Sequence, residues 1–144
     1  MINDSGIEIE KEFLDSFLSE SFEVLASLKE LVSNFSTVED NHLFETYGQN
    51  VDRIMGAAFT LSLNELGELA KMGKELGYKA GQVNDLPKLL SVQSLLSQLA
   101  KSLEEILKKM KKGHTPDFSL YRPLLHKLKK ASAHLGDLRI SVKV

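Results

Sequence analysis

Apolar residues recur every three or four positions along most of the chain, which is the spacing of one face of an α-helix. Between them lie polar positions, and short stretches rich in Ser, Gly, Pro and Asp interrupt the pattern. Five helices are predicted, over residues 8–34, about 36–61, 62–80, 87–112 and 116–136. The fourth alternates strictly by three and four, as in the seam of a coiled coil or bundle, through Leu89, Val92, Leu96, Leu99, Leu103, Ile106 and Met110.

Local signals mark where these helices begin and end. Ser36-Thr37-Val38-Glu39 and Ser62-Leu63-Asn64-Glu65 each place a serine three residues before a glutamate, which predicts capping boxes for the second and third helices. Gly81 is expected to end the third helix, and Pro87 to lie near the first turn of the fourth. The alternating residues 137–144 are interpreted as a short strand or a frayed tail.

These elements predict one all-α domain over residues 1–144. Four helices would form an antiparallel four-helix bundle over about residues 8–112, with a fifth C-terminal helix over about 116–136 and a tail at 137–144. The length of 144 residues, with 42% hydrophobic and 26% charged positions, suits a single globular core.

Composition narrows the classes of function. No apolar run approaches the ~18 residues of a membrane span, and the acidic start lacks a signal-peptide pattern, so a cytoplasmic protein is expected. The absence of cysteine excludes disulfides and thiolate metal sites. His42 and His114 have no spacing typical of a metal site, and no cofactor motif is found.

Charge is distributed unevenly along the chain. Residues 1–70 carry fourteen Asp and Glu against three Lys and Arg, whereas residues 71–144 carry six against fifteen. The simplest interpretation is that acidic and basic helices pair with each other inside one bundle. A nucleic-acid surface is not expected, because the basic residues lack interleaved aromatics and the pI is near 6.1.

The second helix contains two glycines, Gly48 and Gly56, placed four residues on either side of Asp52. Glycine inside a helix costs roughly 0.5–1 kcal/mol relative to alanine, so both positions need a reason. One interpretation is that glycine lets a neighbouring helix cross closely, with Asp52 as a solvated surface acid. The other is a smooth, partly apolar docking stripe made by Glu45, Gly48, Gln49, Asp52, Met55, Gly56 and Phe59.

This region also carries a motif. The segment from Asp52 to Ser62, DRIMGAAFTLS, followed by Leu66 and Leu69, resembles the His-x-Leu-Lys-Gly-Ser-Ala-Ala-x-Leu-Gly motif of histidine phosphotransfer domains, especially the N-terminal domain of chemotaxis kinases. The segment EFLDSFLSESFEVLASLKEL is similar to the first helix of that domain. The resemblance extends over roughly residues 8–112, and the fifth helix corresponds to the family's extra C-terminal helix.

Two positions depart from the motif. Asp52 replaces the phosphoacceptor histidine, and Met55 replaces the lysine that offsets the charge of the phosphate. The resemblance therefore implies a domain that has kept the shape and lost phosphotransfer. Its expected function is non-catalytic binding of the receiver domain of a response regulator, or a related two-component signalling protein. The expected partner-binding residues are Glu45, Gly48, Gln49, Asp52, Arg53, Met55, Gly56 and Phe59.

Three alternatives remain open. The segment from His126 to Gly136 also echoes the motif, which makes His126 a candidate phosphoacceptor in an active phosphotransfer domain. Glu45 and Gln49, one turn apart, resemble the acid–amide pairs with which some receiver phosphatases position a water, so Gln49 is a candidate catalytic residue. Finally, the heptads of residues 89–110 would allow a homodimer instead of a monomer.

Overall fold

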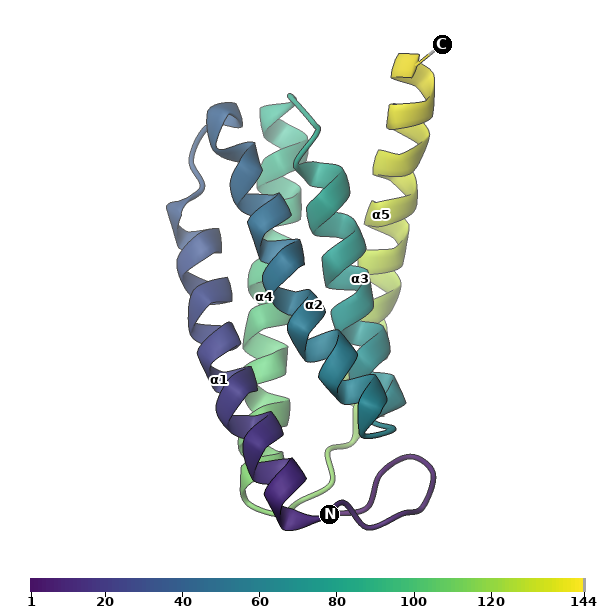
Figure 1. The fold of residues 1–144 in the computed structure, drawn as a ribbon. Coiled ribbons are helices and arrows are strands. Elements are labelled where there is room, and N and C mark those ends of the chain that lie inside the picture. The colour runs from purple at the N-terminus through teal and green to yellow at the C-terminus, as the bar shows by residue number, and fades with distance from the viewer. Residues whose placement is uncertain (144) are drawn as a thin grey trace.

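The computed structural model describes the backbone of residues 1–143 and the side chains of residues 1–136. Apart from one isolated bridge between Ile2 and Glu8, this part of the chain has no β-structure, which confirms the all-α prediction. Five α-helices follow one another (Figure 1): α1 Lys11–Asn34, α2 His42–Thr60, α3 Asn64–Ala80, α4 Leu86–Lys111 and α5 Arg122–Lys143. Short 3-10 helices, η1 Val38–Asn41 and η2 Phe118–Tyr121, precede α2 and α5.

Helices α1 to α4 surround a common core, and consecutive helices run in opposite directions (Figure 1). Helix α1 packs on α2 and α4, while α3 packs on the same two helices from the other side. Helix α5 lies outside this group, against α3 and α4. All seven heptad residues of α4 are buried in the core, so this seam is already covered and offers no surface for a homodimer.

The first predicted capping box is displaced by one residue. Thr37 rather than Ser36 is the N-cap, and Asp40 rather than Glu39 completes the box. The Asp40 carboxylate accepts hydrogen bonds from the backbone N–H groups of Thr37 at 3.1 Å and Ser36 at 3.0 Å, and these bonds lower its pKa. The box therefore opens η1, and α2 begins only at His42.

The second predicted capping box, at Ser62, does not form. Ser62 instead ends α2 in the left-handed conformation, with φ of 58°. The N–H of Leu63 donates to the carbonyl of Ala58, and that of Ser62 to the carbonyl of Phe59, which together make a Schellman motif. Because Ser62 is used in this way, the first N–H groups of α3 need a different acceptor.

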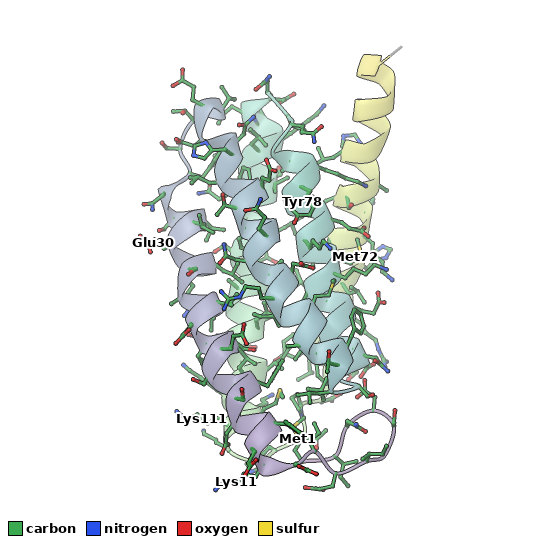
Figure 2. The ribbon with its side chains drawn as sticks, viewed as in Figure 1. Met1, Lys11, Glu30, Met72, Tyr78 and Lys111 are labelled. Atoms are coloured by element: carbon green, nitrogen blue, oxygen red, sulfur yellow. The ribbon has the colours of Figure 1, made fainter. Side chains whose placement is uncertain are left out.

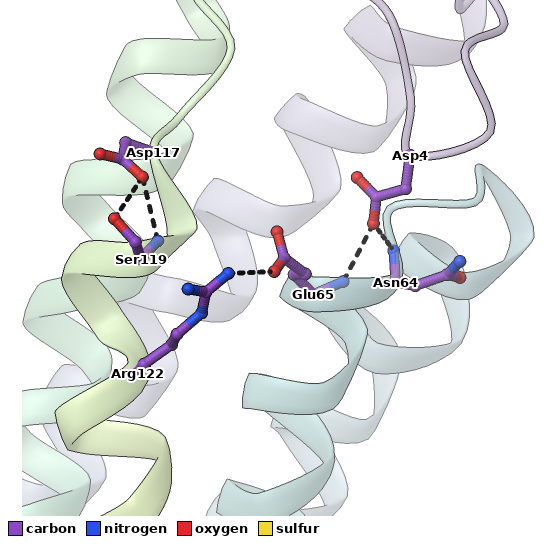
Figure 3. A network of polar contacts seen from close by, with 6 residues as sticks. All are labelled: Asp4, Asn64, Glu65, Asp117, Ser119 and Arg122. Atoms are coloured by element: carbon purple, nitrogen blue, oxygen red, sulfur yellow. Dashed lines mark hydrogen bonds and ion pairs between the residues drawn. The ribbon is translucent and has the colours of Figure 1, made fainter.

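That acceptor comes from the start of the chain. The Asp4 carboxylate lies 2.7 Å from the backbone nitrogen of Asn64 and 3.1 Å from that of Glu65 (Figure 3). A carboxylate here satisfies free N–H groups and complements the positive end of the helix dipole. The N-terminal segment thus holds the turn between α2 and α3, a contact across about sixty residues of sequence that no local signal predicts.

The fifth helix is longer than predicted and starts later. Asp117 accepts hydrogen bonds from the N–H and hydroxyl of Ser119 at the start of η2 (Figure 3). Arg122, the first residue of α5, pairs with Glu65 of α3 at 3.6 Å. Helix α5 then continues to Lys143, so residues 137–143 are helical and the interpretation of this segment as a short strand was wrong. Val144 lies outside the described residues.

Candidate docking surface on α2

The expected partner-binding residues on α2 fall into three groups by their exposure to solvent: exposed, partly covered and buried. Exposed side chains or positions are found at Glu45, Gln49, Arg53, Gly56 and Phe59. Asp52 and Met55 are partly covered, and Met55 packs against the core. Gly48 is buried, on the side of α2 that faces α3.

Gly48 is buried at a close approach of α2 and α3, so including it in the docking stripe was wrong. A Cβ atom added there would lie 3.0 Å from both the carbonyl oxygen of Lys74 and the ring of Tyr78, which α3 carries (Figure 2). Opposite it, a Cβ on Gly77 would lie 2.5 Å from the carbonyl oxygen of Phe44. At Gly48, the interpretation as a close helix crossing is therefore correct.

Gly56 has the opposite environment. It is exposed, and a Cβ added there would meet no atom within 4 Å. No contact among the described residues requires glycine at this position, although glycine weakens a helix interior by about 1 kcal/mol relative to alanine. Gly56 therefore leaves a flat, open area on the outer face of α2.

Asp52 is paired with a lysine from the next helix. Its Oδ1 lies 3.0 Å from Nζ of Lys74 in α3, and this Nζ is also 5.9 Å from the centre of the Tyr78 ring. The hydrogen bond to Asp52 raises the pKa of Lys74. Both side chains keep substantial exposure, so the pair lies on the surface between α2 and α3.

Sequence reasoning missed Lys74 because it searched for a cation on the same helix as Asp52. The antiparallel register of α2 and α3 supplies the signal: Gly48 faces Tyr78, Asp52 faces Lys74, and Phe59 faces Gly67. In each pair the two residue numbers add to 126. Because the Asp52 carboxylate is paired with an ammonium group, this part of the surface carries little net charge.

Arg53 points to the other side, toward α1. Its Nη2 lies 2.9 Å from Oε1 of Glu20, and its Nε lies 3.3 Å from the same oxygen. Phe13 lies seven residues, two helical turns, before Glu20 and therefore on the same side of α1. Phe13 is 58% exposed, and sequence analysis did not include it.

Phe59 supplies the apolar part of the surface on the α3 side. Its ring covers Gly67, where an added Cβ would lie 2.5 Å from the ring, yet the side chain remains 36% exposed. We use "docking surface" below for the outer area formed by Phe13, Gln49, Asp52, Arg53, Gly56, Phe59 and Lys74. It combines an open centre, two exposed phenylalanines and two interhelical ion pairs.

The alternative candidates lie elsewhere or are plain surface residues. His126 is exposed on α5, outside the docking surface. Two small residues of its motif-like segment lie against Lys79 of α3: Lys79 donates a hydrogen bond to the carbonyl of Ser132 at 2.9 Å, and a Cβ on Gly136 would lie 3.0 Å from the same ammonium group. Glu45 and Gln49 are both exposed, one turn apart on α2.

The described part of the chain offers neither a metal site nor a membrane span. Within it, no group of three or more His, Cys, Asp or Glu side chains is arranged to hold a metal ion. None of the helices that the structure describes is long and apolar enough to cross a membrane. Comparison of the sequence with protein-family models, with curated proteins and with solved structures gave no match.

Proposed function

We propose that this protein is a non-catalytic relative of the histidine phosphotransfer domain that binds the receiver domain of a response regulator, or a related two-component protein, through the docking surface. The observation that carries the proposal is the open position at Gly56 beside Asp52, because glycine there serves no internal packing. In this proposal α1 to α4 are the family's antiparallel four-helix bundle and α5 is its additional helix.

The backbone at Ser62 supports the resemblance independently of the docking surface. The motif ends in glycine, and Ser62 occupies that position with φ of 58°, in the left-handed region that favours glycine. The chain thus keeps the backbone geometry for which a glycine is suited, although the residue itself differs. Leu66 and Leu69, the two leucines that follow the motif, are buried in α3.

Docking would proceed without covalent chemistry. Gly56 lets a partner's backbone or side chains approach α2, while Phe13 and Phe59 supply apolar area at the edges of the contact. The pairs Asp52–Lys74 and Arg53–Glu20 lie at or near the surface and offer polar contacts. Because Asp52 is bound to Lys74, we assign it a contact role and not that of an acyl-phosphate acceptor.

The proposal is tested by titrating a panel of unphosphorylated and phosphorylated receiver domains with the wild-type chain and with Gly56→Arg. At least a tenfold loss of affinity is expected, because the arginine would fill the open centre of the surface. The variant should fold normally, since a Cβ at Gly56 meets no atom within 4 Å.

Gln98→Arg is the matched control, because Gln98 is an exposed residue of α4 and the substitution adds the same side chain. Its binding should equal that of the wild type. Equal affinities for wild type, Gly56→Arg and Gln98→Arg would show that receiver domains do not bind through the docking surface.

Incubation with a phosphorylated receiver separates docking from catalysis. We expect no acid-labile phosphate on this chain and an unchanged lifetime of the receiver phosphate. Label that disappears in His126→Ala would instead establish phosphotransfer through α5. Faster loss of receiver phosphate that depends on Gln49 would establish a phosphatase.

A further inference from the structure

The outward face of α5 is strongly basic. Its apolar side chains, including Leu124, Leu128 and Leu135, are buried against the rest of the molecule, which leaves the opposite face to solvent. That face carries one cationic or titratable side chain after another: Arg122, His126, Lys127, Lys129, Lys130 and His134. Apart from the Arg122–Glu65 contact, none of these residues takes part in the ion pairs found among the described side chains.

The outward face of α1 is acidic in the same way. Glu12, Glu23 and Glu30 are exposed and recur at helical spacing along the side of α1 that faces away from the core, and Glu30 points outward from this helix in Figure 2. Ion pairs between described residues of α1 and other helices use Glu20 and Lys29 and leave these three glutamates out.

These two faces cannot neutralise each other within one molecule. Helix α1 and helix α5 lie on opposite sides of the helical group, separated by the other helices (Figure 1). Among the described side chains, the expectation that acidic and basic helices pair internally is met only by single contacts such as Asp52–Lys74 and Glu65–Arg122. At 1.5 Å per residue, the acidic face from Glu12 to Glu30 spans about 27 Å and the described basic face from Arg122 to His134 about 18 Å, so the basic face can lie along most of the acidic one.

The basic face of α5 is better suited to an acidic protein surface than to a nucleic acid or an anionic membrane. Its exposed residues between 122 and 134 include no Phe, Tyr or Trp side chain for stacking on bases and no large apolar side chain for insertion into a bilayer. The whole chain has a net charge of −2, which does not favour attraction to nucleic acid or an anionic membrane. A complementary acidic face, that of α1, is present on every copy of this chain.

We propose that the protein self-associates head to tail, with the acidic face of α1 in one copy lying along the basic face of α5 in the next. Such a contact is heterologous, so it extends into short chains unless the geometry closes a ring. A strip one helix wide and about 18 Å long buries roughly 200 Å² per partner, well below the ~800 Å² of a standard interface. The association is therefore weak and is carried by charge.

Sedimentation velocity across a concentration series at low and high salt tests the proposal. We expect the weight-average mass to rise with protein concentration at about 20 mM NaCl, and the association constant to fall at least tenfold at about 0.5 M, where charges are screened within ~4 Å. A constant monomer mass up to about 1 mM protein at low salt would overturn the proposal.

Charge reversal identifies the faces. The α5 variant Lys127→Glu/Lys129→Glu/Lys130→Glu and the α1 variant Glu12→Lys/Glu23→Lys/Glu30→Lys should each be monomeric alone, and an equimolar mixture should associate again. A matched control, Glu39→Lys/Glu45→Lys/Glu75→Lys, changes net charge as the α1 variant does but leaves both faces intact, so it should still self-associate.

Two results contradict the assignment of the faces. If the control loses association as completely as the α1 variant, net charge and not the α1 face controls the effect. If the mixture of α1 and α5 variants stays monomeric, the two faces do not contact each other. Neither result depends on receiver binding, because the docking surface lies on other residues and Gly56→Arg should self-associate like the wild type.

Discussion

The two glycines of α2 occupy opposite environments. Gly48 lies in the half of the α2–α3 pair where the two backbones are close, which we call the closed half. A Cβ added to Gly48 would lie 3.0 Å from the backbone of α3, and Gly77 of α3 makes a similar close approach to α2. At Gly56, in the open half near the turn to α3, an added Cβ meets no atom within 4 Å. The residues are identical, eight positions apart on one helix, and spaced symmetrically about Asp52.

The comparison shows that glycine at helical spacing has no fixed meaning. In the closed half, the loss of helix propensity is offset by close packing of two helices, which a side chain would prevent. In the open half the described contacts offer no such compensation, so the glycine there calls for a reason outside the molecule. Only the position of α3 distinguishes the two halves.

The largest expected effect is that of Gly77→Ala in the closed half. Its Cβ would lie 2.5 Å from the carbonyl oxygen of Phe44, a backbone atom that cannot turn aside as a side chain can. We expect a loss of about 2–3 kcal/mol in the free energy of unfolding, measured by urea denaturation. Gly56→Ala, the matched change in the open half, should instead stabilise by up to about 1 kcal/mol. Equal effects of the two substitutions would remove the distinction between the halves.

Tyr47→Phe tests a buried hydrogen bond that joins the closed half of α2 to α4. The buried Tyr47 hydroxyl donates to the carbonyl of Leu96 at 2.8 Å, so its removal should cost about 1 kcal/mol at neutral pH.

The same substitution should also change the response to alkali. Burial raises the pKa of Tyr47 above its ordinary value of 10.0, so the folded state keeps its proton where the unfolded state loses it. The stabilising contribution is complete below pH 10 and falls above it, by up to about 1.4 kcal/mol per pH unit. Denaturation at a series of alkaline pH values should show this decline in the wild type and a shallower one in Tyr47→Phe; parallel curves would contradict it.

In the open half, Ser62→Gly is expected to stabilise the protein by about 0.5–1 kcal/mol, because glycine adopts a positive φ without steric cost. The φ of 58° at Ser62 is the only positive value outside glycine in the part of the chain that the structure describes. Thermal denaturation measures the effect. Ser91→Gly is the control, because Ser91 is exposed in the first turns of α4, where glycine should lower the free energy of unfolding. A change of the same sign in the free energy of unfolding for Ser62→Gly and Ser91→Gly would argue against the left-handed conformation at Ser62.

The smallest effect is expected between the two halves, at Asp52 and Lys74. A double-mutant cycle with Asp52→Ala and Lys74→Ala should give a coupling of about 0.2–1 kcal/mol, since both side chains are partly exposed. The coupling should decrease at high salt. No measurable coupling would mean that Lys74 is free for a partner, and the docking surface would then present a cation beside Gly56.

The elements of the fold were predictable because they depend on local patterns. Apolar periodicity placed all five helices, and Pro87 and the Lys-rich end of α4 marked its bounds correctly within a few residues. The helix starts were less predictable, since Ser62 carries a convincing capping-box pattern and yet the cap of α3 comes from Asp4. Residues 137–143 alternate like a strand, but they continue the helix that begins at Arg122.

The candidate site was predictable only on one helix at a time. Periodicity correctly placed Gln49, Arg53, Gly56 and Phe59 on the exposed side of α2. It could not show that Gly48 is covered, that Lys74 lies 3.0 Å from Asp52, or that Arg53 pairs with Glu20 of α1. Each of these depends on the register between neighbouring helices, which is set by packing.

The sequence by itself determined the helices, the single core and the division of the chain into an acidic first half and a basic second half, because helix formation and burial follow from the spacing of residue types. Only the tertiary structure decided which glycine is open, which cation faces Asp52, and that α1 and α5 lie on opposite sides. The physical reason is that contacts between helices depend on how their side chains interlock, and that information is spread over residues far apart in the chain.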